Sequence, residues 1–185
     1  MAYRNGTYVA FNGMGTTNPT EGDMKYYGLL QKWGNEKSLD FKFSDSHKKT
    51  YSVRDTSQDI TLKARLRERM SKSKNMLLII TENSSINRGL LNWEIEIAVD
   101  HYNIPLIIAY TGYSSILHPG SHRGLWPLAL SERIKSKTVK AIHIPFKKAA
   151  IGSAISQFSI HNEKPNGSLS YYSKEVQVRW GLITQ

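Results

Sequence analysis

A glutamate beside an aromatic ring is the residue pair in this sequence best suited to chemistry. Trp93 and Glu94 lie in a segment with helical periodicity, in which apolar residues recur at three- and four-residue steps. The residues of this predicted core stripe are Leu91, Ile95, Ala98 and Tyr102. Glu94 falls beside the stripe, so its carboxylate is predicted to face a cleft rather than open water. An ordinary carboxylate on the helix surface is the alternative, and Glu96 competes with Glu94 for the role.

Other kinds of catalytic site have less support. The chain has no cysteine, which excludes thiolate nucleophiles, disulfides and cysteine-based metal sites. No serine stands in a G-x-S-x-G elbow. His47 has no second metal-binding residue at helical or hairpin spacing, which favours an ordinary surface histidine. We therefore expect neither a metal nor a cofactor.

A glycine-rich loop, Asn12–Thr20, follows the first predicted strand. Backbone N–H groups in such a loop can bind a phosphate. The loop lacks the GK[ST] of a Walker A motif and the third glycine of a dinucleotide fingerprint. A flexible turn and a ligand-binding loop that uses Gly13 both remain open.

One carboxylate is enough to cleave the nicotinamide–ribose bond of NAD. Glycosidases use two carboxyl groups because a poor leaving group has to be protonated while the oxocarbenium-like centre is stabilised. Nicotinamide is already cationic in NAD and leaves as a neutral molecule, so the acid is unnecessary. A single glutamate that stabilises the ribosyl cation and holds its hydroxyls can suffice. Glu94 is the candidate for this role, with NAD as a substrate rather than a cofactor.

The elements around Glu94 predict an α/β fold. Two apolar runs, Met76–Ile80 and Ile104–Ala109, flank the Glu94 helix and are typical of buried parallel strands joined by a crossover helix. Further strands are predicted at Thr7–Phe11, Leu39–Phe43 and Val139–Ile144, and further helices at Asp23–Glu36, Ser57–Ser73, Leu128–Lys135 and Phe146–Phe158. We expect a flavodoxin-like sheet of five parallel strands in the order 2-1-3-4-5, with helices on both faces. Its ligand crevice lies at the carboxyl ends of strands one and three.

Composition bounds the partners and the location. The 185 residues fit one domain at residues 1–160, followed by a linker-like break and a C-terminal appendage at residues 161–185. The net charge of +10 is spread along the chain, which favours a solvated basic surface over a nucleic-acid partner. No apolar run is long enough to span a bilayer. We expect a cytoplasmic protein without a membrane partner.

The segment SSINRGLLNWEIEIA followed by NIPLIIAY resembles the third helix and fourth strand of TIR domains. The resemblance is strongest to the bacterial TIR-like family of Thoeris antiphage systems, typified by ThsB. Two further segments support it: LKARLRERMSKSKNMLLIITENSS before the helix and LWPLAL after the fourth strand. It extends over about residues 7–158 and implies that the flavodoxin-like sheet is a TIR-like one.

By position, the resemblance assigns the catalytic glutamate to Glu94. It implies that Phe11 and Asn12 face the nucleotide, and that Ser44–Gln58 forms the BB loop, which gates the site or drives assembly. Asp45 and Asp55 are the acidic candidates of that loop. Leu90 stands where many TIR domains have an aromatic residue.

Each remaining candidate also has a structural interpretation. Ser84 is predicted to cap the entry of the Glu94 helix first and to contact ligand second. Trp93 is predicted to pack in the core rather than to stack on a ligand. For Phe11, packing in the strand and contact with the nucleotide are equally supported.

The resemblance implies an NAD glycohydrolase or ADP-ribosyl cyclase. Its product would be an ADP-ribose-type signal, cyclic in form, that activates a separate effector protein in antiphage defence. Homo-oligomers are an expected state. The alternatives are a non-catalytic TIR-like module that acts by self-association, and a basic sensor of nucleotides or nucleic acid.

Overall fold

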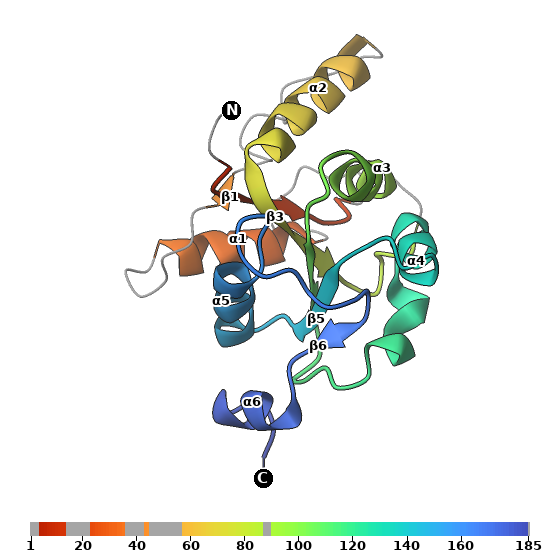
Figure 1. Ribbon diagram of the computed structural model, residues 1–185. Coiled ribbons are helices and arrows are strands. Elements are labelled where there is room, and N and C mark those ends of the chain that lie inside the picture. Colours follow the sequence, from red (N-terminus) through yellow and green to blue (C-terminus); the bar gives the residue numbers. More distant parts are fainter. Residues whose placement is uncertain (1–3, 14–22, 36–42, 45–56, 87–89, 185) are drawn as a thin grey trace.

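Six parallel strands form one sheet within the residues that the structure, a computed structural model, describes: 4–13, 23–35, 43–44, 57–86 and 90–184 (Figure 1). The strands are β1 (Gly6–Ala10), β2 (Phe43–Ser44), β3 (Ser73–Ile80), β4 (Leu106–Tyr110), β5 (Ala141–Pro145) and β6 (Ser170–Tyr171). They lie in the order β2-β1-β3-β4-β5-β6. The predicted α/β class, a flavodoxin-like or TIR-like parallel sheet with helices, is confirmed.

Strand β6 extends the sheet beyond the five predicted strands. Ile142 of β5 pairs with Ser170, and His143 pairs with Tyr171. The segment SLSYYSKEVQVRWGLITQ is compatible with short strands or with an appendage, but two residues without an apolar run carry no periodicity that would place a strand at Ser170–Tyr171. The predicted order 2-1-3-4-5 of five parallel strands is confirmed, and β6 adds a sixth strand at the edge beside β5. The division of the chain at residue 160 stays a prediction.

Helices connect the strands. They are α1 (Met24–Gly34), α2 (Ser57–Ser71), α3 (Leu91–Glu96), α4 (Leu128–Lys135), α5 (Lys148–Gln157) and α6 (Lys174–Arg179), with a 3₁₀-helix at Pro119–Leu125. Across the described ranges, none of them combines the length and the apolar character that a membrane-crossing helix requires.

The sheet is buried on both faces because its central strands are apolar throughout. In β3, Met76, Leu78 and Ile80 join one core cluster, whereas Leu77 and Ile79 join the other. The first cluster contains residues of α2, α3 and α4, and the second contains residues of α1 and α5. The result is a three-layer arrangement, with helices on both faces of the sheet (Figure 1).

Helix α3 (Leu91–Glu96) changes its winding after six residues. Leu91, Ile95 and Ala98 are buried in the first core cluster, as the periodicity predicts. From Ile97 to His101 the chain is a π-helix, and the backbone N–H of Tyr102 bonds to the carbonyl of Ile97 at 3.1 Å. π-helical turns are rare in proteins, and those that do occur often lie at functional sites.

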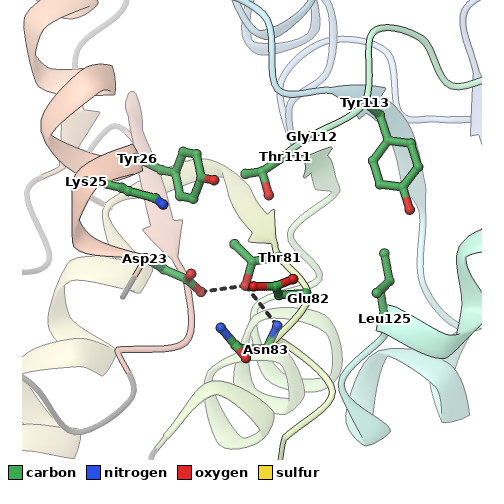
Figure 2. A pocket seen from close by; sticks show the side chains of 10 residues that line it. All are labelled: Asp23, Lys25, Tyr26, Thr81, Glu82, Asn83, Thr111, Gly112, Tyr113 and Leu125. Atoms are coloured by element: carbon green, nitrogen blue, oxygen red, sulfur yellow. Dashed lines mark hydrogen bonds between the residues drawn. The ribbon is translucent and has the colours of Figure 1, made fainter. Parts of the chain in front are cut away.

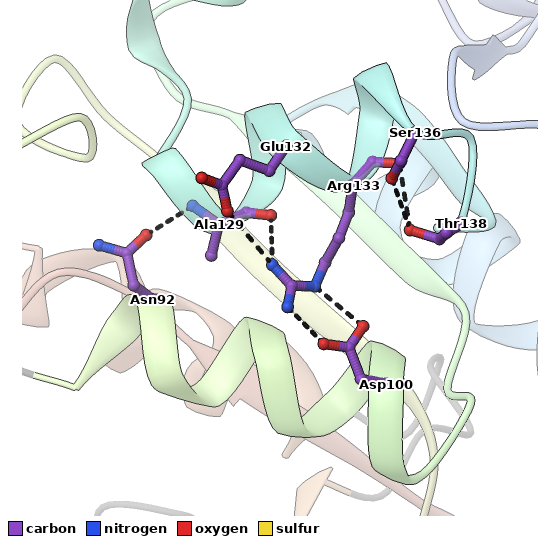
Figure 3. Close-up of polar contacts among 7 residues, drawn as sticks. All are labelled: Asn92, Asp100, Ala129, Glu132, Arg133, Ser136 and Thr138. Atoms are coloured by element: carbon purple, nitrogen blue, oxygen red, sulfur yellow. Dashed lines mark hydrogen bonds and ion pairs between the residues drawn. The ribbon is translucent and has the colours of Figure 1, made fainter.

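Polar contacts hold α3 against α4 (Figure 3). The Asn92 side-chain oxygen accepts from the backbone N–H of Ala129 at 2.9 Å, in the first turn of α4. Arg133 donates from Nε to Asp100 Oδ1 at 3.0 Å, from Nη2 to Asp100 Oδ2, and from Nη1 to the Ala129 carbonyl at 3.0 Å. These contacts fix the orientation of the helix that carries Glu94.

Candidate functional site

Glu94 is buried between α3 and β1. Its exposed fraction is 6%, and its Oε1 accepts a hydrogen bond from the hydroxyl of Tyr8. Tyr8 lies in β1, is fully buried and belongs to the first core cluster. The carboxylate therefore points from the helix toward the sheet and not into bulk water.

Burial controls the protonation of this pair. It raises the pKa of the Glu94 carboxyl to about 7, and the hydrogen bond from Tyr8 opposes that rise. Burial and the nearby carboxyl also raise the pKa of the Tyr8 hydroxyl, so Tyr8 stays a donor. Glu94 is thus poised between its neutral and charged forms near neutral pH, as expected of a catalytic carboxyl.

Burial distinguishes Glu94 from Glu96. Glu96 is half-buried, and after the dominant hydrogen bond to Asp100 its charge adds a smaller part to the rise in the pKa of the Arg133 guanidinium. Glu94 is the one of the two whose carboxylate is directed at β1. Within the described ranges, no group of three histidine, aspartate or glutamate side chains is placed to hold a metal ion.

Asn12 fastens the end of β1 to the segment that follows β3. Its exposed fraction is 2%, and its Nδ2 donates to the carbonyls of Asn83 at 2.8 Å and Ile86 at 3.3 Å. These bonds fix the chain that leads to α3. Asn12 acts here as a positioning residue at the carboxyl ends of β1 and β3.

Phe11 and Trp93 pack against other parts of the protein. Phe11 is buried in the second core cluster and stacks on Tyr27, with ring centroids 5.8 Å apart. Trp93 lies between α3 and α2, where Lys63 Nζ is 5.7 Å and Arg67 Cζ is 5.6 Å from its ring centre. Gly13 is half-exposed beside Asn12.

Ser84 closes a turn and does not cap α3. Its Oγ accepts from the backbone N–H of Thr81 at 2.8 Å, and its own N–H bonds to the Thr81 carbonyl at 3.2 Å. Leu90 occupies the position before α3. The predicted capping role is wrong, because the segment after β3 folds back on Thr81 before the helix begins.

Some candidates lie outside the described residues. They are Asp45, His47, Asp55 and most of the predicted BB loop and glycine-rich loop.

A cleft of about 520 Å³ opens at the carboxyl ends of β3 and β4 (Figure 2). The residues that line it are Asp23, Lys25, Tyr26, Thr81, Glu82, Asn83, Thr111, Gly112, Tyr113 and Leu125. In Figure 2 the α1 side chains face Tyr113 and Leu125 across the two threonines. The sequence predicts a crevice at the carboxyl ends of strands one and three, whereas this cleft lies at the ends of the third and fourth strands.

Glu94 does not belong to the described lining of this cleft. The turn after β3, fastened by Asn12, carries Asn83 into the cleft and leads on toward α3. The single crevice expected from the sequence is therefore two neighbouring features. One is the open cleft, and the other is the buried Glu94–Tyr8 pair.

The sequence reasoning missed much of the cleft. Asp23 and Tyr26 come from the start of α1, and Thr111 and Tyr113 follow β4. The rule that ligands bind outside the carboxyl ends of parallel strands would have pointed to Thr111 and Tyr113. No pattern in the sequence singles out Asp23, whose place depends on a hydrogen bond to the distant Thr81.

A second buried polar cluster crosses β4 and β5. The indole N–H of Trp126 donates to the Tyr110 hydroxyl at 2.7 Å, and that hydroxyl lies 2.7 Å from His143 Nδ1. His143 Nε2 is 2.9 Å from the Ser168 carbonyl, which only accepts, so Nε2 carries the proton and Nδ1 accepts. Burial lowers the pKa of His143 to about 4. This neutral, fully bonded histidine stabilises the fold.

Comparison with known protein families gives a match over residues 8–115 to the family described as Thoeris protein ThsB, TIR-like domain. The matched part runs from β1 through β4 and includes both Tyr8 and Glu94. The segments that contain α4, α5 and α6 follow it.

Proposed function

Because the chain belongs to the TIR-like domain family of the Thoeris antiphage-defence protein ThsB, we propose that it cleaves the nicotinamide–ribose bond of NAD with Glu94. The observation that carries the proposal is the burial of this single carboxylate against Tyr8. A buried carboxyl with a pKa near 7 is costly to keep and is typical of sites that perform chemistry.

The reaction needs only one charged side chain, the carboxylate of Glu94. The C1′–N bond breaks, its electron pair stays on the nicotinamide nitrogen, and neutral nicotinamide leaves. Ionised Glu94 stabilises the positive ribosyl centre in a site of low polarity, where such stabilisation is strong. Water then adds at C1′ and loses a proton, or a hydroxyl or ring nitrogen of the same ADP-ribose adds to give a cyclic product.

Substrate must reach a carboxylate that is now 6% exposed. By the resemblance, the BB loop at Ser44–Gln58 gates the site, with Asp45 and Asp55 among its polar residues. A closed site excludes water and so favours cyclisation over hydrolysis. The product is then an ADP-ribose-type signal that a separate effector protein recognises. NAD is the substrate, and neither cofactor nor membrane takes part.

The test is nicotinamide release from NAD by the purified protein, followed by chromatography. Replacing Glu94 by Gln keeps the size of the side chain and removes its charge. We expect a loss of about 100-fold or more in rate, in line with the removal of one stabilising group at a reacting centre. Glu96→Gln is the matched control and is expected to keep its rate within about threefold.

Lysate from phage-infected cells supplies the trigger if the isolated protein is silent. Nicotinamide release in that lysate by wild type and by Glu96→Gln, but not by Glu94→Gln, supports the proposal. Equal release by all three, or release by none in buffer and in lysate, overturns it.

The same burial also favours a second function. A carboxyl held by Tyr8 inside the core is what a non-catalytic TIR-like module would keep as a structural pair. Such a module would act by self-association. It predicts no nicotinamide release by any variant, so the activity assay distinguishes the two functions, and sedimentation analysis shows whether the protein self-associates.

A further inference from the structure

The cleft at the carboxyl ends of β3 and β4 has a local charge opposite to that of the whole chain. The protein carries a net charge of +10, yet two carboxylates, Asp23 and Glu82, line this cleft together with one ammonium group, Lys25 (Figure 2). Phosphate groups would meet two carboxylates and one ammonium group there. The cleft therefore favours a ligand that donates hydrogen bonds and disfavours an anion.

Asp23 is a preorganised acceptor in this cleft. Its exposed fraction is 3%, and its Oδ2 accepts from the Thr81 hydroxyl at 3.0 Å. The Thr81 hydroxyl in turn accepts from the backbone N–H of Asn83 at 3.2 Å. This chain of bonds holds the carboxylate and the turn after β3 in one geometry (Figure 2). Sugar hydroxyl groups match such fixed acceptors.

Tyr113 supplies an aromatic wall on the opposite side. Its exposed fraction is 37%, and its ring packs edge-on against His122 at 4.5 Å and Tyr110 at 6.3 Å between centroids. Two neighbours thus hold the ring while part of it remains open to the cleft. Tyr26 lies across from it, with its ring against Phe146 at 5.3 Å. Flat heterocyclic rings stack on such side chains.

We infer that this cleft binds a nucleoside, with its ribose hydroxyls on Asp23 and Glu82 and its base on Tyr113. The volume of about 520 Å³ lies in the range of small-molecule sites. Where the protein turns over NAD, the cleft takes the adenosine end, and this extension rests on the proposed function. The phosphates of the dinucleotide then lie outside the cleft.

Calorimetric titration with adenosine tests the site on the full-length protein. Tyr113→Ala is expected to weaken adenosine binding about tenfold, from the loss of stacking on one base. Tyr113→Phe keeps the ring and is expected to bind within about twofold of wild type. Tyr171→Ala removes an exposed tyrosine from β6 and is the matched control without effect. Inorganic pyrophosphate is expected not to displace adenosine.

The outcomes separate this inference from the proposed function. Adenosine binding that depends on Tyr113 supports the site even if no variant releases nicotinamide. Glu94→Gln is expected to keep adenosine binding while losing turnover. No adenosine binding by wild type, equal binding by Tyr113→Ala, or displacement by pyrophosphate overturns the site, whatever the NAD assay gives.

Discussion

The side-chain amide of Gln177 hydrogen-bonds both backbone polar groups of Ile116. Its Oε1 accepts from the Ile116 N–H at 3.0 Å, and its Nε2 donates to the Ile116 carbonyl at 2.8 Å. Gln177 is 1% exposed, and it belongs to α6, beyond the part of the chain that matches the family. Helix α6 thereby anchors the loop after β4, which carries Tyr113 into the cleft.

Gln177→Ala is expected to lower the free energy of unfolding by about 3 kcal/mol, because the N–H and carbonyl of Ile116 and the carbonyl of Tyr172 lose this partner. Urea denaturation monitored by circular dichroism measures this loss. Gln157→Ala, at an exposed glutamine that bonds Tyr172, is the control and should cost less than about 1 kcal/mol. Equal losses in the two variants would show that the bonds of Gln177 stabilise the protein no more than the exposed bond of Gln157 does.

Glu94→Gln is expected to change how stability depends on pH. The folded-state pKa of Glu94, about 7, lies above its usual value of 4.5, so the folded protein holds the proton more tightly. The wild type therefore loses stability as pH rises from about 4.5 to about 7, by a total near 3 kcal/mol. The variant lacks this loss. Urea midpoints of both proteins across that range measure the difference, and Glu96→Gln should follow the wild type.

Tyr8→Phe is expected to move the pH dependence of nicotinamide release to higher pH. The Tyr8 hydroxyl stabilises the charged carboxylate, so its removal raises the pKa of Glu94. The rate requires ionised Glu94 under the proposed mechanism and should rise with pH through a midpoint near 7 in the wild type. Rate profiles from pH 5 to 9 measure the displacement. A midpoint that moves to lower pH, or does not move, contradicts the role of this bond.

His143→Gln is expected to remove an acid-induced loss of stability. The pKa of His143, about 4, lies below its usual value of 6.5, so the folded protein resists protonation of this ring. The wild type keeps the full contribution above about 6.5 and loses about 3 kcal/mol as pH falls through about 4. The variant should lack this dependence although it is less stable at neutral pH. His118→Gln, at an exposed position, should retain it.

The regular elements were predictable because their signals are local. The apolar runs of β3 and β4 and the stripe on α3 each consist of residues close together in the sequence. The runs are continuous because these strands are buried on both faces of the sheet. Helix α4 occupies its predicted range of Leu128–Lys135. Glu94 was found by the same logic, from its place beside the stripe.

The pairs that complete the site were not predictable, because they join distant parts of the chain. Tyr8 and Glu94 are 86 residues apart, and Asp23 and Thr81 are 58 apart. A periodicity argument places each residue on its own element and says nothing of its partner. The role of Ser84 was mistaken for the same reason, because the turn back to Thr81 replaces the expected start of a helix.

The two-residue length of β6 has a consequence for solubility. A strand at the rim of a sheet presents unpaired N–H and C=O groups on which a foreign chain can assemble as an added strand. Here Ser170 and Tyr171 cover part of β5 and offer only a short outer row themselves. Strand β6 therefore offers a strand from another molecule only a short length on which to pair. This short edge protects the protein from aggregation although Leu169 and Tyr171 are exposed there.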